Sequence, residues 1–172
     1  ENRKTYNIKV VNISLTGSLA QSYHTSPIAA ACEVLWFNGI VVVVSSGNKG
    51  HDAVYPPAND PFVITVGAAD SQGTASISDD VVASFSAHGK TSDGFSKPDL
   101  IAPGRHIVGP LAGPYAQLAI LHPANVVNKY YMLMSGTSAA APMVSGAAAL
   151  LLQDEPKLTP DQVKYRLMET AN

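Results

Sequence analysis

A serine hydroxyl, Ser138, lies where a predicted strand meets a predicted helix. The short apolar run Tyr131–Met134 predicts a buried strand, and the apolar run Ala147–Leu152 predicts a buried helix. A hydroxyl at such a junction sits beside the free N–H groups and the partial positive charge of a helix N-terminus. Both features suit a serine that attacks a carbonyl carbon and holds the resulting oxyanion. The alternative is that Thr137 or Ser138 only caps the helix.

The residues around this serine form a longer pattern. Gly136–Pro142 reads Gly-Thr-Ser-Ala-Ala-Ala-Pro and resembles the nucleophile motif of subtilisin-like serine proteases, with Ser138 as the nucleophile. That family usually has Met where this chain has Ala139, and often His where it has Met143. Neither difference touches the reacting hydroxyl. The motif differs from the Gly-x-Ser-x-Gly elbow of α/β-hydrolases.

A second polar segment follows a predicted buried strand. The β-branched run Ile40–Val44 is typical of a strand covered on both faces, and it ends at Gly47-Asn48-Lys49-Gly50. This segment lacks the Gly-x-Gly-x-x-Gly spacing of a dinucleotide loop. It resembles the Gly-Asn segment of subtilisin-like proteases, whose Asn donates to the oxyanion, so the resemblance implies that Asn48 is the oxyanion-hole residue. For an isolated Gly-Asn, the alternative is an Asn in a tight turn.

The order of the elements predicts the fold class. Val10–Ser14 is a predicted strand, and Ser26-Pro27 is an N-cap followed by a proline suited to the first helical position. The helix Ile28–Phe37 and the strand Ile40–Val44 then complete a βαβ unit, which requires a parallel pair. With the family resemblance, we expect an α/β fold: a three-layer α/β/α arrangement with a mainly parallel sheet, the C-terminal portion of a subtilisin-like fold.

Later segments give further expectations. Phe62–Val66 predicts a strand that ends at Gly67-Ala68. Leu158-Thr159-Pro160 predicts a cap for an amphipathic helix over Asp161–Thr170, with Val163, Leu167 and Met168 on its inner face. The segment Gly109–Asn128 resembles an insertion, and its pattern indicates no role.

The resemblance also implies where a substrate binds. An extended peptide is expected to pair with the backbone of one loop and to place the side chain before the cut in a pocket. Lys49 at the rim of that pocket suggests tolerance for an acidic side chain, and a solvated surface lysine is the alternative. The residues assigned to substrate binding are Ser14, Leu15, Thr16, Gly17, Ser45, Ser46, Gly47, Lys49 and Val54.

The general base and its carboxylate partner are not identifiable in this chain. In subtilisin-like enzymes the acid lies in an Asp-Ser/Thr-Gly context and the base in a His-Gly-Thr context, and neither motif occurs here. We therefore expect residues 1–172 to be the C-terminal portion of one catalytic domain. The missing N-terminal portion would act in cis or as a second chain. We expect the chain alone to be inactive, and its open sheet edge to favour aggregation or edge pairing.

Composition excludes several function classes. The chain has 172 residues and a net charge of −2, with no Lys/Arg run, which argues against nucleic-acid binding. No apolar stretch approaches the roughly 18–20 residues of a membrane span. The single cysteine, Cys32, excludes an internal disulfide and is expected in the core. No cofactor or metal ligand set is predicted. Calcium sites are common in the family, and the family implies a secreted protein.

Three functions therefore compete. The favoured one is a serine endopeptidase that acts on protein or peptide substrates through Ser138 and Asn48. The alternative is a non-catalytic binding or scaffolding domain that has kept the subtilisin fold. An unrelated α/β binding module is disfavoured because separate segments match the family in order.

Overall fold

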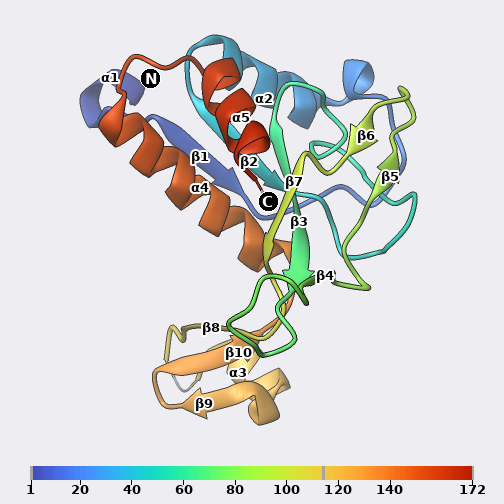
Figure 1. The fold of residues 1–172 in the computed structure, drawn as a ribbon, viewed down its shortest axis with the longest axis vertical. Helices are drawn as coiled ribbons and strands as arrows, with labels where there is room; N and C mark the ends of the chain where they lie inside the picture. The colour runs from blue at the N-terminus through green and yellow to red at the C-terminus, as the bar shows by residue number, and fades with distance from the viewer. Residues whose placement is uncertain (1, 114, 172) are drawn as a thin grey trace.

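The computed structural model describes residues 2–113 and 115–171. Strands and helices alternate through the first half, and a second, smaller sheet separates them from the two C-terminal helices (Figure 1). The elements up to residue 103 are α1 (Arg3–Tyr6), β1 (Val10–Ile13), η1 (Tyr23–Thr25), α2 (Pro27–Phe37), β2 (Val41–Ser45), β3 (Ile64–Asp70), β4 (Val81–Val82), β5 (Gly89–Lys90), β6 (Ser96–Lys97) and β7 (Leu100–Pro103). The later elements are β8 (Ile107–Pro110), α3 (Gln117–Leu121), η2 (Pro123–Asn125), β9 (Val126–Asn128), β10 (Tyr131–Met134), α4 (Thr137–Asp154) and α5 (Pro160–Glu169).

The main sheet is mostly parallel, as the βαβ pattern predicted. Strands β1, β2, β3 and β7 run parallel, and the short β4 pairs antiparallel with the end of β3. All five residues of β2 are buried, which agrees with its β-branched sequence. Strand β1 pairs only with β2 among the described residues, so one of its edges is open.

The predicted helix starts are confirmed. The Ser26 hydroxyl accepts from Ala29 N, and Pro27 occupies the first turn of α2. Thr159 and Gln162 form a reciprocal capping box at the start of α5. These local signals need no tertiary context, which is why the sequence pattern located them.

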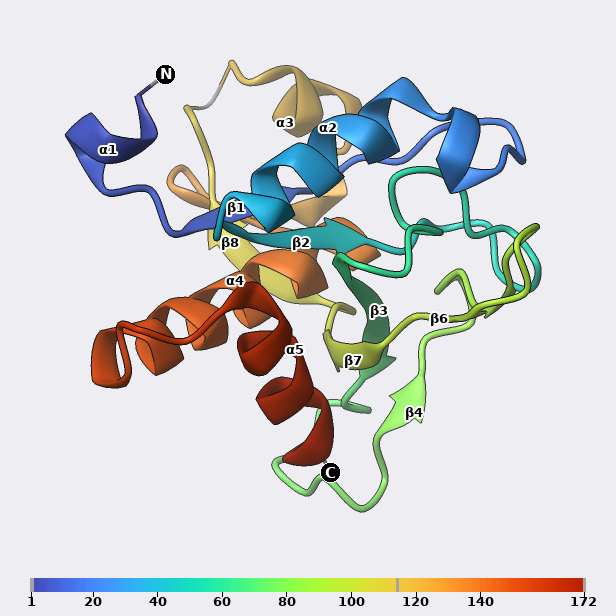
Figure 2. The same cartoon turned by 90° about the horizontal axis from the view of Figure 1, so that it is seen from above.

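The helices form layers around the sheet. Figure 2 shows α2 and α4 on opposite sides of β2. Helix α4 contacts β1, β2, β3 and β7, so it spans the sheet and carries Ser138 at its start. The expected three-layer α/β/α arrangement is confirmed. Within the described residues, no helix is long and apolar enough to cross a membrane.

Two strand predictions need correction. Strand β3 continues through Gly67-Ala68 to Asp70 instead of ending there. Gly67 serves close packing: a Cβ at this position would lie 2.9 Å from both Pro98 and the Ser86 hydroxyl. The strand Tyr131–Met134 exists as β10, but of its four residues only Met132 is buried. The rest of β10 is more exposed because this strand lies outside the main sheet.

Two helix predictions are also wrong in their burial. The run Ala147–Leu152 is not a fully buried helix, since Leu150 is 68% exposed and only Ala148 and Leu152 are buried. Helix α4 covers the sheet with one face, and its other face lies open. In α5, Val163 is buried and Leu167 partly buried, but Met168 is 42% exposed. An apolar sequence shows which residues can be buried and does not show what covers them.

The segment that resembled an insertion belongs to a small antiparallel sheet. Strand β10 pairs with β8 on one side and with β9 on the other. Helix α3 and the turn η2 connect β8 to β9. Figure 1 shows this unit at the foot of the molecule, beyond the end of β3 and away from α2 and α5.

The core joins both faces of the sheet and contains the single cysteine. Cys32 and Trp36 of α2 are buried, as predicted for Cys32, and the indole N–H of Trp36 donates to Asp161 at the start of α5 (2.9 Å). A carboxyl group, Asp60, is fully buried as well. Its Oδ1 accepts from Phe62 N (2.8 Å), but its Oδ2 has no hydrogen-bond partner among the described residues.

Asp60→Asn is expected to stabilise the protein at neutral pH. Burial raises the pKa of Asp60 from 3.8 to about 6. Between these values the folded protein keeps a proton that the unfolded chain has released. Its stability therefore falls as the pH rises through this window, and the loss is complete above pH 6. We expect a gain on the order of 1–3 kcal/mol above that pH.

The measurement is the free energy of unfolding of both proteins across this pH range, and the difference should vanish near the acid end. The exposed Asp154→Asn is the matched control. Equal stability of Asp60→Asn and the wild type above pH 6 would contradict the burial cost.

Candidate active site

Ser138 is exposed at the first turn of α4. The chain leaves β10 at Met134 and enters the helix at Thr137. Gly104 holds this junction against the sheet, because Gly136 N donates to Gly104 O (2.8 Å) and Gly104 N donates to Ala69 O (3.0 Å). A Cβ on Gly104 would lie 2.6 Å from the Cβ of Ala68, so only glycine permits this approach. The predicted position of Ser138 at a strand-to-helix junction is therefore confirmed.

Ser138 is hydrogen-bonded to the loop after β1. Its Oγ donates to the carbonyl of Ser14 (3.3 Å), and the Ser14 hydroxyl donates to the carbonyl of Ser138 (3.0 Å). The Asn12 side chain donates to Ser14 Oγ (2.9 Å) and accepts from Ser145 of α4 (3.1 Å). These contacts place the predicted substrate loop 14–17 directly beside the nucleophile.

Asn48 lies against the same helix start. Its Oδ1 accepts from Thr137 N (2.9 Å) and from the Thr137 hydroxyl (3.1 Å). Because a backbone N–H can only donate, the amide oxygen must face Thr137, which leaves Nδ2 as a donor. A Cβ built on Gly136 would lie 3.3 Å from Asn48 Nδ2 and 3.8 Å from Ser138 N. The side-chain N–H of Asn48 and the backbone N–H of Ser138 thus both lie within 4 Å of this position beside Gly136. Asn48 is exposed to solvent.

Thr137 is the residue that holds this arrangement, and the motif alone did not reveal its role. It is fully buried, and its hydroxyl also accepts from Gly47 N (3.1 Å). The hydroxyl is therefore a link between the loop after β2 and the start of α4. Its place beside Ser138 was the only signal in the sequence.

The remaining predicted substrate residues fall into two groups. Leu15, Thr16, Gly17 and Lys49 are exposed, and the Lys49 ammonium lies 5.3 Å from the Tyr55 ring centroid. Ser45, Ser46 and Val54 are buried together with Gly47. Gly17 N donates to Pro56 O (2.7 Å), which joins the loop 14–17 to the loop that follows Val54.

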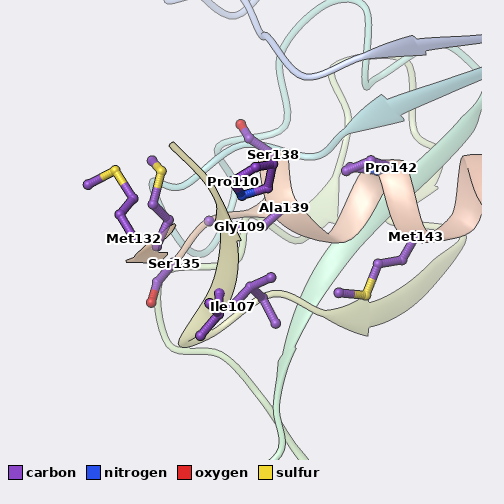
Figure 3. A pocket seen from close by; sticks show the side chains of 12 residues that line it. Ile107, Gly109, Pro110, Met132, Ser135, Ser138, Ala139, Pro142 and Met143 are labelled. Atoms are coloured by element: carbon purple, nitrogen blue, oxygen red, sulfur yellow. The ribbon is translucent and has the colours of Figure 1, made fainter. Parts of the chain in front are cut away.

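An apolar hollow is lined in part by Ser138, and no sequence pattern indicated it. Its volume is about 500 Å³, and its walls come from α4 and the small sheet. Figure 3 shows Met132 and Ile107 on one side and Pro142 and Met143 of α4 on the other. The lining residues are Ile107, Val108, Gly109, Pro110, Met132, Met134, Ser135, Gly136, Ser138, Ala139, Pro142 and Met143.

The histidines of the described chain are engaged elsewhere or not bonded to the nucleophile. His88 Nδ1 lies 3.0 Å from Ser86 O, and His51 lies 2.8 Å from Asp52. No hydrogen bond joins a histidine to Ser138 in residues 2–113 and 115–171. Over the same ranges, no group of three or more His, Cys, Asp or Glu side chains could hold a metal ion.

The comparisons with known proteins identify the family. The sequence profile of the subtilase family matches residues 3–172, and the chain belongs to that family. It is 44% identical to serine protease AprX of Bacillus subtilis (strain 168) over 164 residues, covering 93% of this chain and 37% of the relative. It is 36% identical to the extracellular serine proteinase of Thermus sp. (strain Rt41A), covering 94% of this chain and 32% of the relative.

A solved structure supports the same assignment. The crystal structure of a cold adapted subtilisin-like serine proteinase matches with a TM-score of 0.63 and 31% identity, covering 90% of this chain and 45% of that one. The chain thus spans less than half the length of each of these three proteins. The predicted subtilisin-like fold is confirmed.

Thr137→Val should weaken catalysis in the intact protein by disordering Asn48. The substitution keeps the side-chain volume and the backbone N–H bond but removes the hydroxyl that contacts Asn48 and Gly47. The loss of the hydrogen bond between the Thr137 hydroxyl and Asn48 corresponds to roughly a tenfold fall in kcat, with KM little changed.

The measurement is steady-state peptide hydrolysis, and Thr137→Ser is the matched control because it restores the hydroxyl. If Thr137→Ser were as slow as Thr137→Val, the hydroxyl would not be the group that positions Asn48.

Proposed function

We propose that this chain supplies the nucleophile and the oxyanion hole of a serine endopeptidase. The observation that carries the proposal is the pairing of Asn48 with Thr137 directly beside Ser138. Ser138 Oγ attacks the scissile carbonyl, the leaving amine departs, and water then hydrolyses the acyl-enzyme. Ser138 N is among the first N–H groups of α4, which have no acceptor within the helix, so it is available to the oxyanion. Asn48 Nδ2 is available as well, because it is the amide oxygen of Asn48 that contacts Thr137.

The proton of Ser138 must pass to a base that lies outside these 172 residues. In the structure the Ser138 hydroxyl donates to the carbonyl of Ser14, a group that does not accept a proton in catalysis. The proposed source is the N-terminal portion of the same catalytic domain, in cis or as a second chain. Residues 1–172 then form the C-terminal portion of that domain. The relatives, all more than twice as long, support this view.

Two features of the surface fit such a partner portion. The edge of β1 is unpaired among the described residues, and an additional parallel strand could bind there. The hollow beside Ser138 is apolar and includes Met143, 41% exposed, and Met134, also 41% exposed. A helix or loop packed in this hollow would reach Ser138, so the base is proposed to approach from this side.

Substrate is proposed to bind as an extended strand along the loop 14–17. The exposed backbone of Leu15 and Thr16 offers hydrogen-bonding groups at the edge of the site. Lys49, exposed beside Tyr55, is proposed to give the rim of the site a positive charge. Protein or peptide substrates follow from the family, and the name of the extracellular Thermus relative supports a secreted protein.

Labelling of Ser138 by a fluorophosphonate probe tests the nucleophile. We expect the intact protein to be labelled at Ser138, and both Ser138→Ala and the folded chain 1–172 to remain unlabelled. In subtilisin, loss of the nucleophile or the base alone lowers kcat by roughly 10⁶. The readout is mass spectrometry of the labelled peptide.

Three results would change the proposal. Labelling of residues 1–172 alone would mean that a base lies within them. No labelling of the intact protein would favour a non-catalytic binding domain. Labelling at another serine would overturn the assignment of Ser138.

Asn48→Ala tests the oxyanion hole in the intact protein. Removal of the corresponding amide in subtilisin lowers kcat about 10²–10³-fold, and we expect a loss of the same order here. The loss should fall on kcat rather than KM, because the oxyanion forms only in the transition state. A loss below about tenfold would make Asn48 a turn residue.

A further inference from the structure

Two lysine side chains converge on a set of oxygen atoms at the start of β3. The oxygens are the backbone carbonyls of Pro61, Phe62 and Val63 and the carboxylate of Asp99, and we call this set the oxygen cage. Three carbonyls and one carboxylate are the kind of ligand that a hard cation such as Ca²⁺ takes. In this protein the cage holds ammonium groups instead.

Lys164 of α5 fills one side of the cage. Its Nζ donates to Pro61 O (2.8 Å) and Val63 O (2.8 Å) and lies 3.1 Å from Asp99 Oδ1. Phe62 O lies further from Nζ (3.4 Å), so the three shorter contacts match the three N–H donors of an ammonium group. Its side chain is 15% exposed. Lys164 therefore ties the last helix to the loop that precedes β3.

Lys97 fills the other side. Its Nζ lies 2.8 Å from Asp99 Oδ2 and 3.2 Å from Val63 O, and its side chain is only 2% exposed. Val63 O and the Asp99 carboxylate are shared by both lysines. Asp99 is in turn fixed by Thr65 N, which donates to its Oδ2 (2.7 Å).

The charges also match those of a divalent ion. Two ammonium groups carry a charge of +2, as a single Ca²⁺ does. A buried lysine normally carries a large desolvation cost, and Lys97 is compensated here by Val63 O and the Asp99 carboxylate. We infer that Lys97 and Lys164 together replace a divalent metal ion in this cage, so that the domain needs no bound calcium at this position.

The protonation of Lys97 is consistent with this role. Burial, opposed by Asp99 and assisted by the charge of Lys164, lowers the pKa of Lys97 to about 8. The ammonium form therefore prevails at neutral pH. The other buried acid near the cage is Asp60; burial raises its pKa, and the charges of Lys97 and Lys164 oppose that shift only in part.

The residues at this cage do not fit a calcium ion while both lysines are present, because the two ammonium groups already contact its oxygens. Removal of both side chains would leave three carbonyls and a carboxylate with space for a cation and its waters. The structure thus assigns a latent calcium site that the wild-type lysines keep closed.

The test compares calcium responses of the wild type and of Lys97→Ala/Lys164→Ala in the intact protein. Without metal, the double variant should be less stable than the wild type. Calcium at about 10 mM should then raise its Tm by roughly 5 °C more than it raises that of the wild type. Isothermal titration should find one more bound calcium per molecule in the double variant. Magnesium should have little effect, because it requires shorter contacts and a stricter geometry.

Two further variants serve as controls. Asp99→Asn in the double-variant background should abolish the additional response, whereas the exposed Lys157→Ala should respond as the wild type does. If the double variant fails to fold, Lys164→Ala alone is measured in the same way, because its side chain enters from the surface. The inference is overturned if neither variant shows an additional calcium response, or if Asp99→Asn lowers the calcium response of the wild type itself.

Discussion

The hydrogen bonds between Asn48 and Thr137 are the constraint on which the site depends. They join the loop after β2 to the first turn of α4, two segments 89 residues apart in the chain. Because Thr137 donates to the Asn48 amide oxygen twice, the amide nitrogen can face only outward. The N–H groups that we propose as oxyanion donors are therefore oriented by the fold before any substrate arrives, which is the condition for strong electrostatic stabilisation of a transition state.

The parallel sheet makes this contact possible. Strands β2, β3 and β7 run in the same direction, so the segments that follow them gather at one edge. Gly104 follows β7 and binds Gly136 through its carbonyl, while Asn48 follows β2 and binds Thr137. The start of α4 is thus held from two sides, and Ser138 projects between them.

The sequence predicted those features that depend on local chemistry. The caps at Ser26 and Thr159, the β-branched strand β2 and the serine at a helix start are each encoded within a few residues. The predictions failed where burial depends on distant partners. Leu150 and Met168 are apolar yet exposed, and Tyr131 lies on a sheet that only pairing with β8 and β9 creates. The shared contacts of Lys97 and Lys164 with Val63 O and Asp99 could not be predicted, because no short pattern records them.

The structure divides the catalytic task into two parts with different physical requirements. Charge stabilisation needs fixed dipoles, and the chain builds these from Asn48, Thr137 and the N-terminus of α4. Proton transfer needs a base whose pKa lies near the working pH, and within residues 2–113 and 115–171 the acceptor of the Ser138 hydroxyl is the Ser14 carbonyl. Under the proposed function, a partner portion would have only to bring a base to a hydroxyl that the sheet edge already positions. Ser138 lines the hollow beside Met143, so packing of that portion in the hollow would couple assembly of the domain to completion of its active site.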